Sequence, residues 1–151
     1  MHTLHRTHTL IAAVTLSGAL AFIAGCAPMA PTSGTMSTQT YALSGSFEVP
    51  PVTTTATGSA TVTINPDRTV QAAVTVNSMT ATASHIHEGA AGTNGPVIVP
   101  FTKTGDNTFA AAADAKLTEA QYASYKAGNL YVNVHSSKNP GGEVRAQLKA
   151  N

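Results

Sequence analysis

Three histidines, in two segments far apart in the sequence, have the residue type and spacing of a metal site. His85 and His87 are separated by one residue, Ile86, and His135 ends the segment 130–135. The other three of the chain's six histidines lie close to its first residue. Alternate side chains of a β-strand point to the same face, so His85 and His87 share one face and Ile86 lies on the other.

The segment 130–135 alternates between an apolar and a polar face: Leu130, Val132 and Val134 against Tyr131, Asn133 and His135. We expect the apolar face to pack in the core, which leaves all three imidazoles on the outer, solvent-facing side of the sheet. If the two strands are neighbours, the three rings converge. Three imidazole nitrogens suit copper or zinc, and the usual order of affinities favours copper, with zinc as the rival. The alternative is three solvated side chains that bind no ion.

Four polar residues near the histidines are candidates for supporting roles. Arg145 shares the outer face with His135 if 130–135 and 143–148 form a hairpin. It either steers an anion towards the metal or forms a surface pair with a carboxylate, which is worth little. Glu88, Asn133 and Glu143 are candidates to accept a histidine N–H, although Glu88 is equally well explained as a solvated loop residue.

The N-terminus predicts a secretory signal and a lipid anchor. In residues 1–25, Arg6 precedes an apolar stretch that is too short to span a membrane as a helix. Small residues then precede Cys26, as in a bacterial lipobox, whose cysteine is lipidated; the alternative is an ordinary signal peptide with an incidental cysteine. Ala27, rather than Asp, follows the cysteine, which favours the outer membrane of the cell envelope. We expect residues 26–40, rich in Pro, Ser and Thr, to be a disordered tether and 41–151 to be the folded domain.

The composition argues against several classes of protein. Charged residues make up 10% of the chain, aromatic residues 5%, and there is no Trp, as in β-rich extracytoplasmic proteins rather than helical bundles. Loss of the leader leaves seven basic and seven acidic residues, so there is no basic field to attract nucleic acid. No Gly-x-Ser-x-Gly motif or glycine-rich phosphate loop is present, and a single cysteine cannot form an internal disulfide.

Short alternating strands separated by turn residues predict an all-β domain. We expect an antiparallel Greek-key β-sandwich or barrel of seven to eight strands over 41–149. The expected strands are 41–49, 59–64, 69–76, 83–87, 96–101, 108–112, 130–135 and 143–148. A single helix is expected over 118–127, with Thr118 and Gln121 as a capping box and Gly128 as its stop.

Several motifs together resemble the CHRD (chordin-type) domain, over about 41–149. They are Leu43-Ser-Gly-Ser-Phe-Glu-Val-Pro-Pro, Ala83-Ser-His-Ile-His-Glu-Gly, Asn94-Gly-Pro-Val, Leu130-Tyr-Val-Asn-Val-His-Ser and Asn139-Pro-Gly-Gly-Glu-Val-Arg-Ala-Gln-Leu. The resemblance implies a β-rich fold, but no firmly established biochemical activity.

The two histidine segments also resemble the copper site of Cu/Zn superoxide dismutase, with His-x-His-Glu on one strand and Val-His ending another. This resemblance implies that His85, His87 and His135 are copper ligands in a superoxide-dismutase-like fold. The chain has no further histidine to bridge copper to zinc and no cysteine pair, so it implies a copper-only site. Three hypotheses follow: a copper-binding module, a copper-only dismutase-like enzyme, or a structural or interaction module of the envelope without metal.

Overall fold

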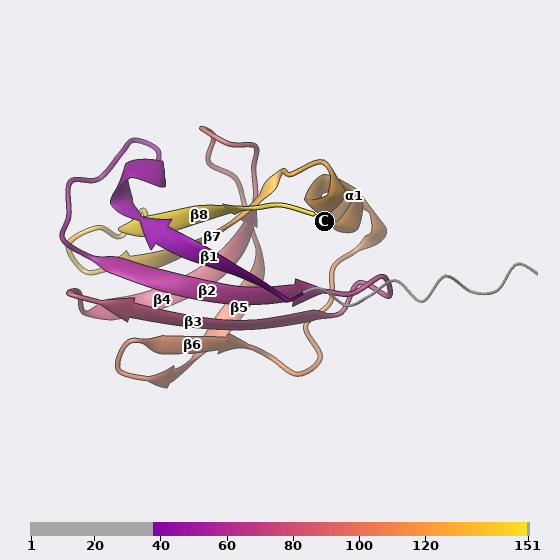
Figure 1. Cartoon of the computed structure of the whole chain (residues 1–151), viewed down its shortest axis with the longest axis horizontal. Coiled ribbons are helices and arrows are strands. Elements are labelled where there is room, and N and C mark those ends of the chain that lie inside the picture. Colours follow the sequence, from indigo (N-terminus) through magenta and orange to yellow (C-terminus); the bar gives the residue numbers. More distant parts are fainter. Residues whose placement is uncertain (1–37, 151) are drawn as a thin grey trace, which may run out of the picture. The chain divides into compact units, whose positions relative to one another are not determined.

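A computed structural model of the chain describes residues 38–150, which form a closed antiparallel barrel of eight strands with one short helix (Figure 1). The elements, in chain order, are β1 (Gln39–Ser44), the 3-10 turn η1 (Gly45–Phe47), β2 (Thr57–Ile64), β3 (Val70–Asn77), β4 (Ala81–Glu88), β5 (Val97–Gly105), β6 (Thr108–Ala111), α1 (Glu119–Lys126), β7 (Leu130–Ser136) and β8 (Val144–Leu148).

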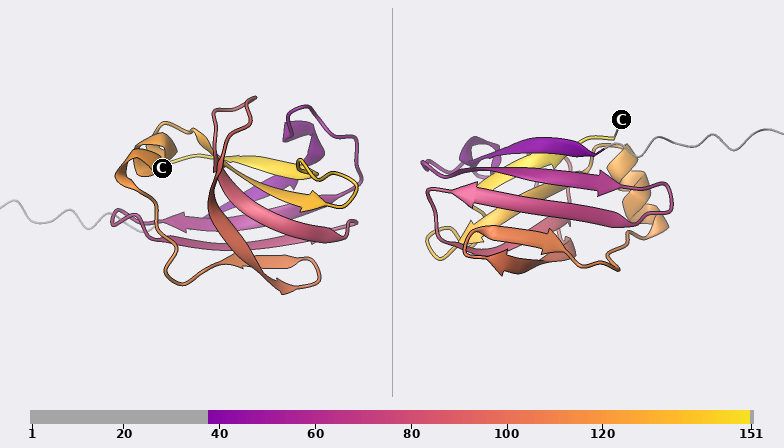
Figure 2. Two further views of the ribbon diagram at one scale, coloured as in Figure 1. Left: turned by 180° about the vertical axis from the view of Figure 1, so that it is seen from behind. Right: turned by 60° about the horizontal axis from the view of Figure 1, so that its bottom comes forward.

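The strand order around the barrel is β1-β2-β3-β6-β5-β4-β7-β8. A pair between Ser44 and Arg145 joins β8 back to β1 and closes the sheet. The order places β4 beside β7, although α1 and two strands separate them in the sequence (Figures 1 and 2). The all-β prediction is therefore confirmed as a barrel. The Greek-key connection pattern and the likeness to superoxide dismutase stay predictions.

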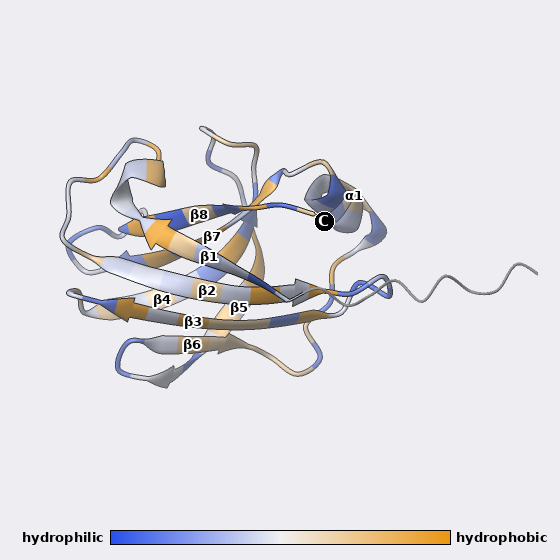
Figure 3. Cartoon of the chain, in the orientation of Figure 1, coloured by the Kyte–Doolittle hydropathy of each residue, from blue (hydrophilic) through white to orange (hydrophobic). Residues whose placement is uncertain are grey.

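Strict alternation of side chains builds the core of the barrel. In β3, Val70, Val74 and Val76 are buried whereas their neighbours in the strand are mostly exposed, and Figure 3 shows bands of differing hydropathy along this strand. Branched side chains fit the pleated, half-buried surface of such a strand. Ile86 of β4 and Val132 of β7 are fully buried in the same core, as their phase in the sequence predicts.

The one helix is confirmed almost at its predicted bounds. The Thr118 hydroxyl accepts from the Gln121 N–H, and the Gln121 side chain accepts from the Thr118 N–H, which completes the capping box. Gly128 follows with φ of +75°, a conformation that suits glycine and ends the helix.

Strands β1 and β5 differ most from the sequence prediction. Strand β1 begins at Gln39, inside the predicted tether 26–40, and ends at Ser44 rather than at Val49. The chain turns at Gly45 into η1, and an added Cβ there would clash with the Val52 carbonyl oxygen, so the turn requires glycine. Strand β5 runs on to Gly105, beyond its predicted end at Phe101, because it pairs with β6 along that length.

The predicted signal peptide, Cys26 and most of the predicted tether lie outside the described residues. Within residues 38–150, no helix has the length and apolar character needed to cross a membrane.

Candidate metal centre

The pairing of β4 with β7 brings the three predicted histidines together. The register places Ala83 opposite His135 and His85 opposite Asn133, so the outward side chains of the two strands interleave. One ring nitrogen from each of His85, His87 and His135 lies within 4.8 Å of those of the other two. The predicted convergence of the three rings is confirmed, and these residues could hold a metal ion.

Backbone carbonyls fix the orientation of two of the rings. The Nδ1 atom of His87 lies 2.9 Å from the Gly95 carbonyl oxygen, and that of His135 lies 3.0 Å from the Pro140 carbonyl oxygen. A carbonyl only accepts hydrogen bonds, so each Nδ1 carries the hydrogen and each Nε2 is left with a free lone pair. This is the arrangement of a metal-binding histidine, in which one ring nitrogen is anchored and the other faces the ion.

The remaining contacts leave the donor atoms close to coordination geometry. His85 Nδ1 lies 3.0 Å from His135 Nε2, whereas the buried His87 Nε2 has no hydrogen-bond partner. Metal–imidazole bonds of about 2.0–2.1 Å place ligand nitrogens roughly 3.3–3.6 Å apart. The three donor nitrogens, which lie within 4.8 Å of one another, are therefore near the spacing that an ion requires.

Burial keeps the three imidazoles neutral. It lowers the pKa of His85 to about 4, and the neighbouring His135 and His87 lower it further. Burial also lowers the pKa values of His87 and His135, although their hydrogen bonds to Gly95 and Pro140 act in the opposite direction. Neutral imidazole is the form that binds metal, so the rings are ready as ligands around neutral pH.

The prediction that this face of the sheet is exposed to solvent is wrong. His87 and His135 are only 8% and 9% exposed, and Arg145 is 1% exposed. Two loops supply the covering contacts: the loop 89–96 contacts His87 through Gly95 and Arg145 through Thr93, and the loop 137–143 contacts His135 through Pro140. Alternation predicted which side chains point away from the core, but not that two loops cover them.

Arg145 anchors the loop 89–96 rather than facing solvent. Its guanidinium donates to the Thr93 carbonyl at 2.8 Å and to the Asn94 side-chain oxygen at 3.1 Å. It also lies 3.3 Å from the centre of the Tyr131 ring. The guanidinium therefore binds groups of the protein itself. It does not lie on the surface beside the metal site, where the sequence predicts it.

Tyr131 joins this anchor to the histidines. Its ring stacks on His87 with a centroid distance of 4.8 Å and an interplanar angle of 7°. Its hydroxyl accepts from the Gly95 N–H at 3.2 Å, so Gly95 contacts Tyr131 through its N–H and His87 through its carbonyl. An added Cβ at Gly95 would lie 1.6 Å from the Glu88 carbonyl oxygen, so only glycine fits at this position.

The three predicted supporting residues have different surroundings. Glu88 accepts from the Ser124 hydroxyl of α1, and Glu143 accepts from the Thr54 hydroxyl at 2.7 Å, so neither holds a histidine. Asn133 lies directly opposite His85 on one side and Arg145 on the other. It is 1% exposed and is the one of the three that lies among the ligands.

The comparisons with known proteins agree with the motifs. The family model of the CHRD domain matches residues 39–148. The chain belongs to the CHRD domain family. No curated protein and no solved structure matched the chain.

Glu48 is a buried residue of this CHRD domain that sequence reasoning missed. It is 4% exposed, and its Oε1 atom is buried without a hydrogen-bond partner. Burial raises its pKa to about 7, although Arg145 and Asn133 act to lower it. In the expected strand 41–49, alternation places Glu48 on the same face as Ser44 and Ser46, which carries no signal of burial, so only the Ser-Phe-Glu-Val-Pro-Pro motif itself marked this position.

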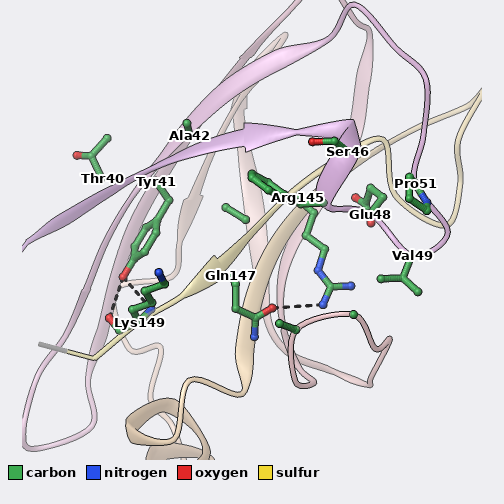
Figure 4. Close-up of a pocket in the computed structure, with 14 residues that line it drawn as sticks. Thr40, Tyr41, Ala42, Ser46, Glu48, Val49, Pro51, Arg145, Gln147 and Lys149 are labelled. Atoms are coloured by element: carbon green, nitrogen blue, oxygen red, sulfur yellow. Dashed lines mark hydrogen bonds between the residues drawn. The ribbon is translucent and has the colours of Figure 1, made fainter.

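A cavity of about 790 Å³ opens beside Glu48, between β1, η1, β8 and the loop 89–96 (Figure 4). Tyr41, Phe47 and Val49 contribute apolar lining, and Arg145 also borders the cavity. None of the three histidines lines this cavity, so the cavity is separate from the candidate metal centre.

Proposed function

We propose that this CHRD domain is a copper-binding module of the bacterial cell envelope, with His85, His87 and His135 as its ligands. The supporting observation is the convergence of three neutral imidazoles within 4.8 Å. The anchored Nδ1 atoms of His87 and His135, and the unpartnered Nε2 of His87, indicate a site arranged for an ion rather than three unrelated side chains.

The donor set supports copper ahead of zinc. All three donors are imidazole nitrogens without thiolate or carboxylate, and copper(II) exceeds zinc in affinity for a given nitrogen site. Structural zinc sites usually have four protein ligands, whereas the described residues contribute only three to this cluster.

The proposal is binding rather than superoxide dismutation. Arg145, the cation that the sequence suggested as a guide for superoxide, is buried, and its guanidinium donates to carbonyl groups of the loop 89–96. A buried guanidinium with these partners is poorly placed to attract an anion from solvent.

A titration of the domain with Cu(II) and Zn(II) against competing chelators tests this proposal. We expect one ion per domain, tighter binding of Cu(II), and an electron paramagnetic resonance spectrum with nitrogen hyperfine coupling. Binding no tighter than millimolar for either ion would refute the metal function and leave a structural or interaction role. A superoxide assay on the copper-loaded domain should show no more activity than free copper.

We also propose that a lipid on Cys26 holds the domain at the membrane, with the outer membrane favoured. The support is the apolar stretch followed by small residues and a cysteine. The domain would then hold copper on the extracytoplasmic side, close to the membrane surface.

A further inference from the structure

The candidate metal centre lies beside a buried positive charge. The Arg145 guanidinium is 1% exposed and lies 3.3 Å from the centre of the Tyr131 ring, which stacks on His87; its charge adds to burial in lowering the pKa of His87. A charge that repels a proton on His87 also repels a metal cation bound there. The three neutral imidazoles carry no negative charge that would offset this repulsion.

Glu48 is placed to cancel that charge. Its Oε1 atom and the Asn133 Nδ2 atom both approach Gly142, and Asn133 lies across the strands from both His85 and Arg145. Burial lowers the pKa of Arg145, and the charge of Glu48 acts in the opposite direction. Buried charges interact strongly because little water screens them.

The backbone is shaped to admit this carboxylate. Gly142 has φ of +137°, and a Cβ there would lie 2.5 Å from Glu48 Oε1 and 2.7 Å from Asn133 Nδ2. Any larger residue would displace the carboxylate or the amide. The space beside Gly142 is thus kept for the Glu48 carboxylate and the Asn133 amide.

We propose that Glu48 is a specificity-determining residue of the candidate metal centre, whose buried carboxylate favours divalent over monovalent ions. This inference rests on the proposed function. A Coulomb energy is proportional to the charge of the ion, so Glu48 stabilises a divalent ion twice as much as a monovalent one. If the loss of its charge lowers the affinity for a monovalent ion by a given factor, it lowers the affinity for a divalent ion by the square of that factor.

The test compares the wild-type domain with Glu48→Gln at pH 8, above the Glu48 pKa of about 7. Zn(II) and Ag(I) serve as probes that do not change oxidation state, followed by Cu(II) and Cu(I). At an effective dielectric constant near 20, we expect a loss of roughly tenfold for the monovalent ions and of the square of that factor, roughly a hundredfold, for the divalent ions.

Two further variants separate charge from structure. Glu48→Asp keeps the charge and should retain the wild-type preference, because the adjoining cavity allows solvent to fill the space left by the shorter side chain. Glu88→Gln is the matched control, since Glu88 adjoins His87 in the sequence but bonds to Ser124 of α1, and it should change neither affinity.

The outcomes distinguish the two proposals. If the wild-type domain binds none of the four ions, the proposed metal function is wrong and the inference falls with it. If the wild type binds but Glu48→Gln weakens both classes of ion by the same factor, or neither, the metal function stands and the role of Glu48 is refuted. Loss of the preference in Glu48→Asp would also refute it.

Discussion

The substitution Gly95→Ala isolates the contact that holds both the loop 89–96 and the His87 ring. The new Cβ would be 1.6 Å from the Glu88 carbonyl oxygen, which belongs to the backbone and cannot rotate away. The loop must therefore shift. Gly95 would then lose the hydrogen bonds that its carbonyl accepts from His87 and that its N–H donates to Tyr131.

The expected loss of stability follows from these contacts. Forcing an extra methyl group into a packed site costs roughly 1–3 kcal/mol, and two lost hydrogen bonds add roughly 1–3 kcal/mol. We therefore expect Gly95→Ala to lower the free energy of unfolding by about 2–6 kcal/mol, a large part of a typical total of about 5–15 kcal/mol. Metal affinity should fall about 10–100-fold, because the His87 ring loses the acceptor of its Nδ1 hydrogen.

Gly92→Ala in the same loop is the matched control. Gly92 has φ of +79° but no atom within 4 Å of the added Cβ, so only the backbone conformation is penalised, by about 1–2 kcal/mol. Urea unfolding of the metal-free domain and copper titration of both variants provide the comparison. If Gly95→Ala is no less stable than Gly92→Ala and binds copper equally well, the role given to Gly95 is refuted.

Three further predictions concern protonation, the buried arginine and the lipid anchor. Because the pKa of His85 in the folded domain is about 4, well below the 6.5 of an unfolded histidine, His85 should lower the stability of the metal-free domain as pH falls from about 6.5 towards 4, whereas Glu48, whose pKa is raised to about 7, acts in the opposite direction. A histidine NMR titration that gives His85 a midpoint near 6.5 would contradict this. Arg145→Ala should destabilise the domain by about 3–5 kcal/mol in thermal or urea unfolding, because it leaves the loop carbonyls and Glu48 without their cation; a loss below about 1 kcal/mol would indicate a surface arginine. Cys26→Ala should release the protein from the membrane fraction, whereas a precursor unchanged in size under globomycin would exclude lipidation.

Side-chain alternation explains how much of the site could be predicted. It placed Ile86 and Val132 in the core and the three histidines together on the other face, and the structure confirms both. The alternation within each strand already determines which side chains share a face. The hairpin of β7 with β8 determines that Arg145 lies on the same face as His135.

The covering of that face could not be predicted from alternation. The sequence marks 89–96 as a loop, but its path depends on contacts between residues far apart, such as Asn94 with Val49 and Arg145 with Thr93. For this reason, His87 and Arg145 were expected in solvent, although both are buried. The same limit hid Glu48, whose role depends on Gly142 and Asn133 rather than on its own neighbours in the chain.

The burial also changes the expected behaviour of the histidine variants. Exposed ligands could be removed without effect on the fold, whereas His87 and His135 each donate to a backbone carbonyl in a covered site. Removing either side chain should cost the metal-free domain about 1–3 kcal/mol. Removal of the partly buried His85 side chain should cost less, because its ring contacts the His135 ring rather than a backbone carbonyl.

A Cu(II) titration of His135→Ala tests the three-histidine centre most directly, because this ligand reaches the site only through the pairing of β4 with β7. With circular dichroism confirming that the variant is folded, we expect its copper affinity to fall by at least about a hundredfold, like that of His87→Ala. If His135→Ala binds copper as the wild type does while His87→Ala does not, the three-histidine centre is wrong and only a local chelate of His85 and His87 remains.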